Sequence, residues 1–268
     1  TEATLDLAED DELMGLMTDA NIGGIFIGIE TPNEDSLRET KKHHNVRPAA
    51  GSLLDRVHII QRAGIEVTCG MIVGFDHDDA TIFQAQQQFL AEAYIPHAMI
   101  GLLYATPKTP LYDRLNKEGR LDPSDISEFG TNVIPHNLSR RQLLDGYIST
   151  MQSVYEVNAY FDRLEALYLR GYLGQGQLGG VKYLKRHPWL RVKYEVMNAA
   201  IAVALMYRLI KGVKEKGLRR EYYQRVWRAL QVETLPSFVS GYIVNCILHY
   251  HYYNIVKGLS SGQFISTM

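Results

Sequence analysis

The chain has 268 residues, a formal net charge of −2, 46% apolar residues and 22% charged residues. These values are typical of a soluble globular protein with a sizeable core, and they give no global indication of nucleic-acid binding. The two cysteines, Cys69 and Cys246, exclude a disulfide framework and favour a reducing, cytoplasmic setting. The longest apolar run, residues 199–210, is interrupted by Arg208 and is too short to span a membrane, so we expect a buried helix there.

The first half of the chain alternates strand-like and helix-like segments. It begins without Met and enters a strand-like segment at once, so we expect residue 1 to be a cut inside a longer protein. The nearly continuous apolar character of the strands favours a parallel sheet with helices on both faces. The expected strands are residues 3–8, 24–30, 66–75 and 97–105, and the expected helices are residues 10–20, a segment from about residue 33, residues 79–93 and residues 109–118.

The pattern changes after residue 130. A polar, proline-containing segment, residues 131–137, leads into a part of the chain that reads as helices only. We therefore predict two domains, residues 1–130 and residues 131–268. The expected helices are residues 139–169, 190–216, 218–232 and 235–259. Four large side chains recur at helical spacing in the first of them and are expected in the core: Tyr147, Met151, Tyr155 and Tyr160.

Ligands of parallel β/α folds bind at the carboxyl ends of the strands, and polar residues follow each expected strand here. Glu30 ends the second strand, where a carboxylate is either a ligand contact or a solvated loop residue. Gly70 and Gly74 lie inside the third strand, and such glycines often mark a close approach of the backbone to a ligand. The other strand ends carry Asp6 or Glu9 after the first strand, residues 74–78 after the third and residues 104–107 after the fourth.

An acidic cluster after the third strand resembles a metal site. It contains Asp76, His77, Asp78 and Asp79. Adjacent acids before a helix more often act as caps and as partners of the helix dipole, and we favour that interpretation over metal binding.

Three ordered segments, FIGIETPNEDSLRETKK, IQRAGIEVTCGMIVGFD and AMIGLLYATPKTPLYDRLNKEGRL, give the chain a family resemblance. It resembles the second half of the catalytic domain of radical S-adenosylmethionine (SAM) enzymes over roughly residues 1–125. The most similar group carries an N-terminal cobalamin-binding domain and a helical C-terminal domain, and hopanoid methylases belong to it. The resemblance implies an α/β fold, a half TIM-like barrel followed by an all-helical domain, in the C-terminal fragment of a methyltransferase.

The resemblance also implies roles for particular residues. Glu30 would accept hydrogen bonds from the ribose hydroxyls of SAM, and Lys42 or Lys41 would contact its carboxylate. Gly70, Ile72 and Gly74 would support the adenine. Residues 102–105, among them Leu102 and Tyr104, would lie beside the adenine. Glu2 or Asp6 would face the cofactor or the substrate.

The family's Cys-x3-Cys-x2-Cys motif, which holds a [4Fe–4S] cluster, is absent from this chain. We therefore expect the cluster and cobalamin only in a full-length parent enzyme, and we expect this chain alone to be inactive. Two alternatives stay open: a β/α-barrel lyase or isomerase with Glu30 or Asp76 as base, and a non-catalytic helical interaction module.

The partners expected from the sequence follow from the same features. The substrate is a small or lipid-like molecule that the sequence does not identify, and we expect no nucleic-acid partner. Membrane contact by residues 190–210 and 240–256 is the less favoured alternative to packing within the helical half. An unpaired first strand predicts self-association, most simply as a dimer, through residues 2–8.

Overall fold

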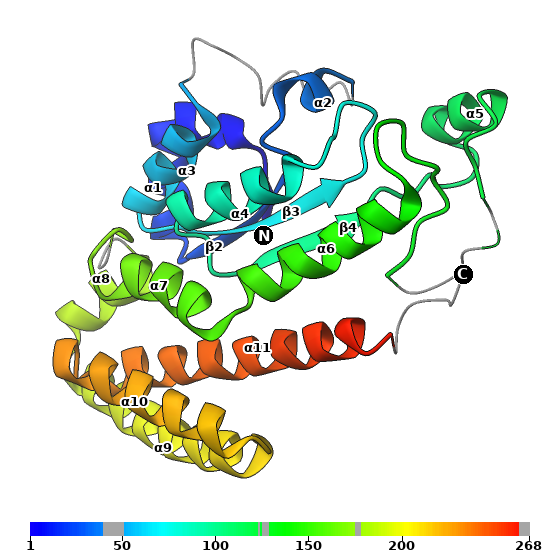
Figure 1. Cartoon of the computed structure of the whole chain (residues 1–268). Helices are drawn as coiled ribbons and strands as arrows, with labels where there is room; N and C mark the ends of the chain where they lie inside the picture. The colour runs from blue at the N-terminus through cyan, green and yellow to red at the C-terminus, as the bar shows by residue number, and fades with distance from the viewer. Residues whose placement is uncertain (40–50, 123, 125–128, 175–177, 263–268) are drawn as a thin grey trace.

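The computed structural model describes residues 1–39, 51–122, 124, 129–174 and 178–262, and its centre is a parallel sheet of four strands (Figure 1). The strand order follows the chain order, β1-β2-β3-β4. The strands are β1 (Glu2–Ala3), β2 (Gly24–Glu30), β3 (Glu66–Val73) and β4 (Ala98–Leu102). The parallel α/β fold expected from the alternating pattern is therefore confirmed.

Helices connect the strands, and local capping fixes where several of them begin. Asp10 accepts the Leu13 amide at the start of α1, Ser52 and Asp55 form a capping box at α3, and Thr109 caps α5 just before Pro110. The elements of this half are the 3-10 helix η1 (Leu5–Glu9), α1 (Asp11–Asp19), α2 (Glu34–Glu39), α3 (Leu53–Arg62), α4 (Ile82–Glu92) and α5 (Pro110–Lys117).

The two faces of the sheet differ in burial. One face carries buried Ile, Val, Cys and Met side chains, such as Ile27 and Met71, and it packs against α3, α4 and α6. We call the other the open face, because its residues are half-buried or exposed in the described part of the chain. The expectation of helices on both faces therefore differs from the structure. The open face consists of Glu2, Phe26, Gly28, Thr68, Gly70, Ile72, Met99 and Gly101.

The expected first strand, residues 3–8, is wrong beyond Ala3, since Leu5–Glu9 forms the 3-10 helix η1. The reason is burial, because Leu5, Leu7 and Ala8 all lie in the core, where η1 contacts α3. In a strand, Leu7 and Ala8 would point to opposite faces. The edge that β1 offers is therefore only two residues long, and self-association through residues 2–8 stays a prediction.

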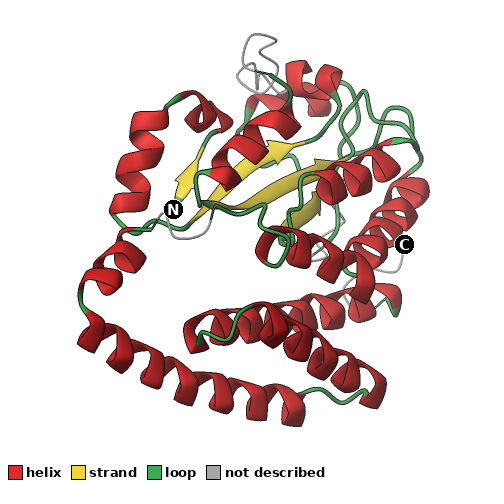
Figure 2. Ribbon diagram, turned by 90° about the vertical axis from the view of Figure 1, so that its left-hand side faces the viewer, coloured by secondary structure: helices red, strands yellow, loops and turns green. Residues whose placement is uncertain are grey.

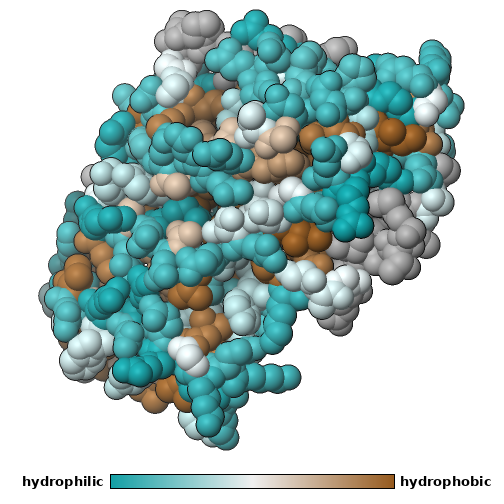
Figure 3. Space-filling view, viewed as in Figure 1, coloured by the Kyte–Doolittle hydropathy of each residue, from teal (hydrophilic) through white to brown (hydrophobic). Residues whose placement is uncertain are grey.

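The second half of the chain is helical, as expected, and Figure 2 shows its long helices beside the sheet. The single helix expected over residues 139–169 is two helices, because Glu156 caps a new one by accepting the Ala159 amide. Some apolar side chains of this half stay on the surface, seen in brown in the lower part of Figure 3. The helices are α6 (Arg140–Val154), α7 (Val157–Tyr168), α8 (Gly179–Arg186), α9 (Pro188–Gly212), α10 (Lys216–Val232) and α11 (Pro236–Ser260).

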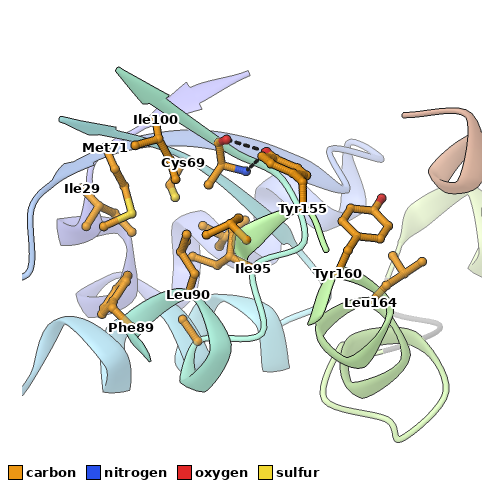
Figure 4. Close-up of a cluster of buried hydrophobic side chains, with 14 of the residues drawn as sticks. Ile29, Cys69, Met71, Phe89, Leu90, Ile95, Ile100, Tyr155, Tyr160 and Leu164 are labelled. Atoms are coloured by element: carbon orange, nitrogen blue, oxygen red, sulfur yellow. Dashed lines mark hydrogen bonds between the residues drawn. The ribbon is translucent and has the colours of Figure 1, made fainter. Parts of the chain in front are cut away.

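Buried polar contacts attach the helical half to the outer edge of β4. The Tyr155 hydroxyl donates to the Ala98 carbonyl at 2.6 Å and accepts the Ala98 N–H at 3.2 Å (Figure 4). The Arg163 side chain donates to the carbonyls of Ile95 and Val154 at 2.8 and 2.6 Å. Tyr147, Met151, Tyr155 and Tyr160 are all buried, which confirms their expected place in the core. The division at residue 130 stays a prediction.

Two buried tyrosines of this region make a matched test of the edge contact. Tyr155→Phe leaves the Ala98 N–H and C=O without their side-chain partner, and we expect a loss of about 2–4 kcal/mol in the free energy of unfolding. Tyr147→Phe removes a buried hydroxyl that makes no hydrogen bond to any described residue, and we expect no loss or a small gain. Urea unfolding of both variants measures the difference, and equal losses would contradict the contact.

His249 lies at the centre of the same interface as a neutral ring. Its Nε2 donates to the Tyr155 carbonyl at 3.1 Å, and its Nδ1 accepts the Tyr222 hydroxyl at 2.6 Å. Burial lowers the pKa of His249 from 6.5 to about 4. The folded protein therefore holds this ring without a second proton at neutral pH.

This shift predicts that the protein loses stability in acid. Because the folded pKa lies below the unfolded one, the contribution of His249 is fully present above pH 6.5 and is lost as the pH falls toward 4. We expect a loss of up to about 3 kcal/mol over this window. Urea unfolding at a series of pH values measures it. His249→Gln should flatten the slope, and an unchanged slope would assign the effect to other groups.

Candidate functional site

The carboxyl ends of β2 and β3 and the loops that follow them form the candidate site. Two side-chain contacts tie these loops together. Asn33 donates to the His77 carbonyl at 3.5 Å, and the Ser36 hydroxyl donates to Asp78 at 2.9 Å. The two loops thus form one unit at the edge where the sequence predicts a ligand.

Glu30 is the last residue of β2 and has a left-handed backbone, with φ of 69°. The register of β2 against β3 is irregular between Gly28 and Glu30, and the buried Thr31 that follows donates its amide to the Ile29 carbonyl at 2.9 Å. A non-glycine residue in this conformation costs about 1–2 kcal/mol. Strain of this kind concentrates at functional sites, so the structure adds a second reason to consider Glu30.

Asp78 shapes the turn after β3. It is buried, and its carboxylate accepts the amides of Gly74 and Phe75 at 2.8 and 3.0 Å as well as the Ser36 hydroxyl. Burial raises the pKa of Asp78 although these hydrogen bonds lower it. Gly74 has φ of 108°, a conformation that needs glycine, and its Cβ would lie 3.1 Å from Leu143. The turn itself therefore explains Gly74.

Asp76 belongs to an ion-pair network that the sequence did not indicate. Its carboxylate accepts from Arg120 at 2.6 Å and from Arg114. Glu39 also accepts from Arg114, at 2.9 Å. Burial would raise the pKa of Asp76, but the hydrogen bonds from Arg120 and Arg114 lower it to about 2. A pocket of about 640 Å³ is lined by Asp76, Arg114 and Arg120 together with His77, Glu118, His136 and Asn137.

The acidic cluster at residues 76–79, which resembles a metal site in the sequence, is divided among separate tasks. Asp78 holds backbone amides, Asp79 accepts the Thr81 amide at 2.8 Å, and Asp76 pairs with arginines. The favoured interpretation as turn and cap residues therefore fits Asp78 and Asp79. Within the described ranges, no group of three or more His, Cys, Asp or Glu side chains is placed to hold a metal ion.

The structure brings some of the predicted site residues together and separates others. Gly70 and Ile72 lie on the open face in the strand beside Glu30, and a Cβ at Gly70 would lie 3.0 Å from the ring of Phe26. Leu102 packs partly against the core, while Tyr104 is exposed.

The remaining predicted residues lie farther from the strand ends or outside the description. Glu2 pairs in register with Phe26, toward the amino end of β2. Asp6 lies in η1, 3.9 Å from Arg56. Lys42 and Lys41 fall outside the described residues. Glu39, Arg114 and Arg120 were missed, because pairs this far apart in sequence leave no local pattern.

The two cysteines do not fit an iron–sulfur cluster. Cys69 lies in β3 and Cys246 in α11, and both are fully buried. Burial raises the pKa of Cys69 to about 12 and also raises the pKa of Cys246, so both sulfurs are protonated thiols. Cluster ligands are thiolates, and three of them are needed where SAM holds the fourth iron.

The thiols should therefore resist modification in the folded chain. We expect negligible reaction with a thiol reagent under native conditions and two thiols per chain in denaturant. Anaerobic reconstitution with iron and sulfide should give no stoichiometric cluster, as judged by absorbance. Fast native reaction of either thiol, or a SAM-cleaving cluster on this chain, would contradict the structure.

Three curated relatives share sequence with the chain. A hopanoid C-2 methylase of Rhodopseudomonas palustris is 28% identical over 98% of this chain and 46% of its own length. An uncharacterized methyltransferase of Synechocystis is 35% identical over 63% of this chain and 32% of its own length. A bacteriochlorophyllide d C-12(1)-methyltransferase of Chlorobaculum tepidum is 26% identical over 52% of this chain and 30% of its own length. The resemblance to the hopanoid-methylase-like group is confirmed.

The chain spans less than half the length of these curated relatives. A family model described as a domain of unknown function, DUF4070, matches residues 109–263, which include α5 to α11. Because this match covers more than half of the chain, the chain belongs to the DUF4070 family.

Proposed function

We propose that the chain is part of a SAM-dependent methyltransferase of the radical SAM type and that it contributes the ribose and adenine side of the SAM site. The relatives named as a methylase or methyltransferases support the reaction class. The parallel sheet supports the location, because ligands of such sheets bind beyond the carboxyl ends of the strands.

The observation that carries the proposal is the left-handed backbone of Glu30 at the end of β2. Nothing in the glutamate side chain favours this conformation, whereas glycine would adopt it freely. The strain is understandable if the carboxylate is needed at this place. A carboxylate there accepts both ribose hydroxyls at once, which a neutral side chain does less well.

The open face offers a fitting surface for the adenine. Gly28 and Gly70 are register partners, and a Cβ at Gly101 would meet no atom within 4 Å. A flat base can thus approach the backbone at Gly101, beside the exposed Met99, whereas the half-buried Phe26 ring covers Gly70. SAM, when bound, supplies the methyl group or the radical precursor, while these residues orient it.

We infer that the iron–sulfur cluster and cobalamin bind to other parts of a longer protein, and that this chain alone is inactive. The protonated, buried thiols support this inference. The names of two relatives refer to a hopanoid and to a bacteriochlorophyllide, so we propose a polycyclic, mostly apolar substrate. The two free cysteines favour a reducing setting, so we propose a cytoplasmic site of reaction. The alternative of a lyase or isomerase loses Asp76 as its base, since a carboxyl with a pKa of about 2 is a weak proton acceptor.

Substitutions at Glu30 separate its charge from its backbone strain. Glu30→Gln should weaken SAM binding, measured by calorimetry, by about tenfold or more, because it replaces a charged acceptor. Glu30→Gly should lose the same affinity and gain up to about 1 kcal/mol in the free energy of unfolding, because the strain disappears.

Lys108 provides the matched control, since its φ is also 69° and it lies in the exposed turn before α5. Lys108→Gly should gain similar stability and leave SAM affinity unchanged. Unaltered binding by Glu30→Gln, or no SAM binding by the parent chain, would refute the proposed role.

A further inference from the structure

Helix α9 exposes a continuous apolar stripe. Only Asn198 and Leu209 of its residues are buried, on the side that packs against α11. The opposite side carries side chains at helical spacing that are largely exposed: Trp189 (79%), Val196 (66%), Val203 (72%) and Tyr207 (57%). The stripe is about 27 Å long from Trp189 to Tyr207. Contiguous apolar surface of this extent marks a contact with a protein or a membrane.

The charged residues of α8 and α9 are mostly basic. Residues 179–212 contain seven lysines or arginines, of which Lys182 pairs with Asp19 of α1 at 2.8 Å, and a single acid, Glu195. Glu195 is half-buried and accepts the amide and the hydroxyl of Ser237, each at 2.9 Å, so it is turned to α11. Lys185, Arg186 and Lys193 are all exposed near the tryptophan end of the stripe. A basic, aromatic and apolar surface results.

This combination fits a lipid surface better than a protein. Lysine is depleted in protein–protein interfaces, whereas lysine and arginine beside Trp and Tyr are typical of helices that lie at the membrane–water boundary. Within the described residues, no helix is long and apolar enough to cross a membrane. The stripe runs along the helix, so the helix would lie flat on a bilayer.

We propose that α8 and α9 form a docking surface for an anionic lipid bilayer. Trp189, Val196 and Val203 enter the boundary between headgroups and acyl chains. Lys185, Arg186 and Lys193 contact the lipid phosphates. This inference does not depend on the proposed methyl-transfer function, because it uses no residue of the candidate site.

Vesicle binding by the purified chain tests the proposal. We expect co-sedimentation with vesicles of phosphatidylcholine and phosphatidylglycerol, weaker binding to phosphatidylcholine alone, and release by high salt. In a Trp227→Phe background, the fluorescence of Trp189 should shift to the blue on binding. The chain contains two tryptophans, so this variant reports on α9 alone.

Two sets of variants separate the apolar and the charged contributions. The pair Val196→Glu and Val203→Glu should weaken binding to anionic vesicles at least about tenfold, because two exposed apolar contacts become charged. The triple variant Lys185→Gln, Arg186→Gln and Lys193→Gln should also weaken it at least about tenfold. Leu16→Glu is the matched control, since Leu16 is a 61% exposed apolar residue on α1, and it should bind as the parent does.

Three results would overturn the proposal. The first is failure of the parent chain to bind anionic vesicles. The second is binding that the Val196→Glu and Val203→Glu pair leaves unchanged while circular dichroism shows a folded chain. The third is a concentration-dependent dimer in light scattering that the same pair dissolves, which would assign the stripe to a second copy of the chain.

Discussion

The arrangement of the whole chain depends on how the outer edge of β4 is satisfied. An edge strand presents amide and carbonyl groups that need partners once they are buried. Here Tyr155 supplies both partners to Ala98, the first residue of β4, and Arg163 supplies one to Ile95 in the segment just before the strand. Because these side chains come from the end of α6 and from α7, these contacts hold the junction of the two helices against the sheet. His249 then donates to the Tyr155 carbonyl and attaches α11 to the same point.

The regular part of this fold could be predicted from the sequence, because its pattern is local. β2 and β3 alternate buried and half-buried residues, and α2 and α5 start at the capping residues Asn33 and Thr109. The prediction of the first strand failed beyond Ala3. The segment LDLA alternates apolar and polar residues as a strand does, but Leu5, Leu7 and Ala8 are buried together in a 3-10 helix. The break between α6 and α7 was also missed, because its cap is Glu156, which accepts the Ala159 amide but is not one of the usual N-cap residues Ser, Thr, Asp or Asn.

In the candidate site, too, local features could be predicted from the sequence and features set by distant contacts could not. The position of Glu30 at a strand end follows from the sequence, but its left-handed backbone depends on the irregular register against β3. Residues 76–79 look like one cluster in the sequence, yet distant partners distinguish Asp76 from Asp78. The Ser36 hydroxyl donates to Asp78, whereas Arg114 and Arg120 form ion pairs with Asp76. Such pairings involve contacts across 38 or more residues, for which a single sequence holds no periodic signal.

Helices α9 and α11 show why composition alone does not decide burial. Both contain 25 residues, begin at a proline and are rich in apolar side chains. α11 carries Asn245 and His249 at helical spacing. Asn245 bonds to His97 just before β4, and His249 bonds to the Tyr155 carbonyl at the end of α6, the residue whose hydroxyl holds the β4 edge. α9 has no such anchor among its described contacts, since Asn198 and Glu195 bond to α11 itself or to their own helix. α11 therefore lies in the interior. α9 packs one side against α11, and its opposite apolar side stays exposed.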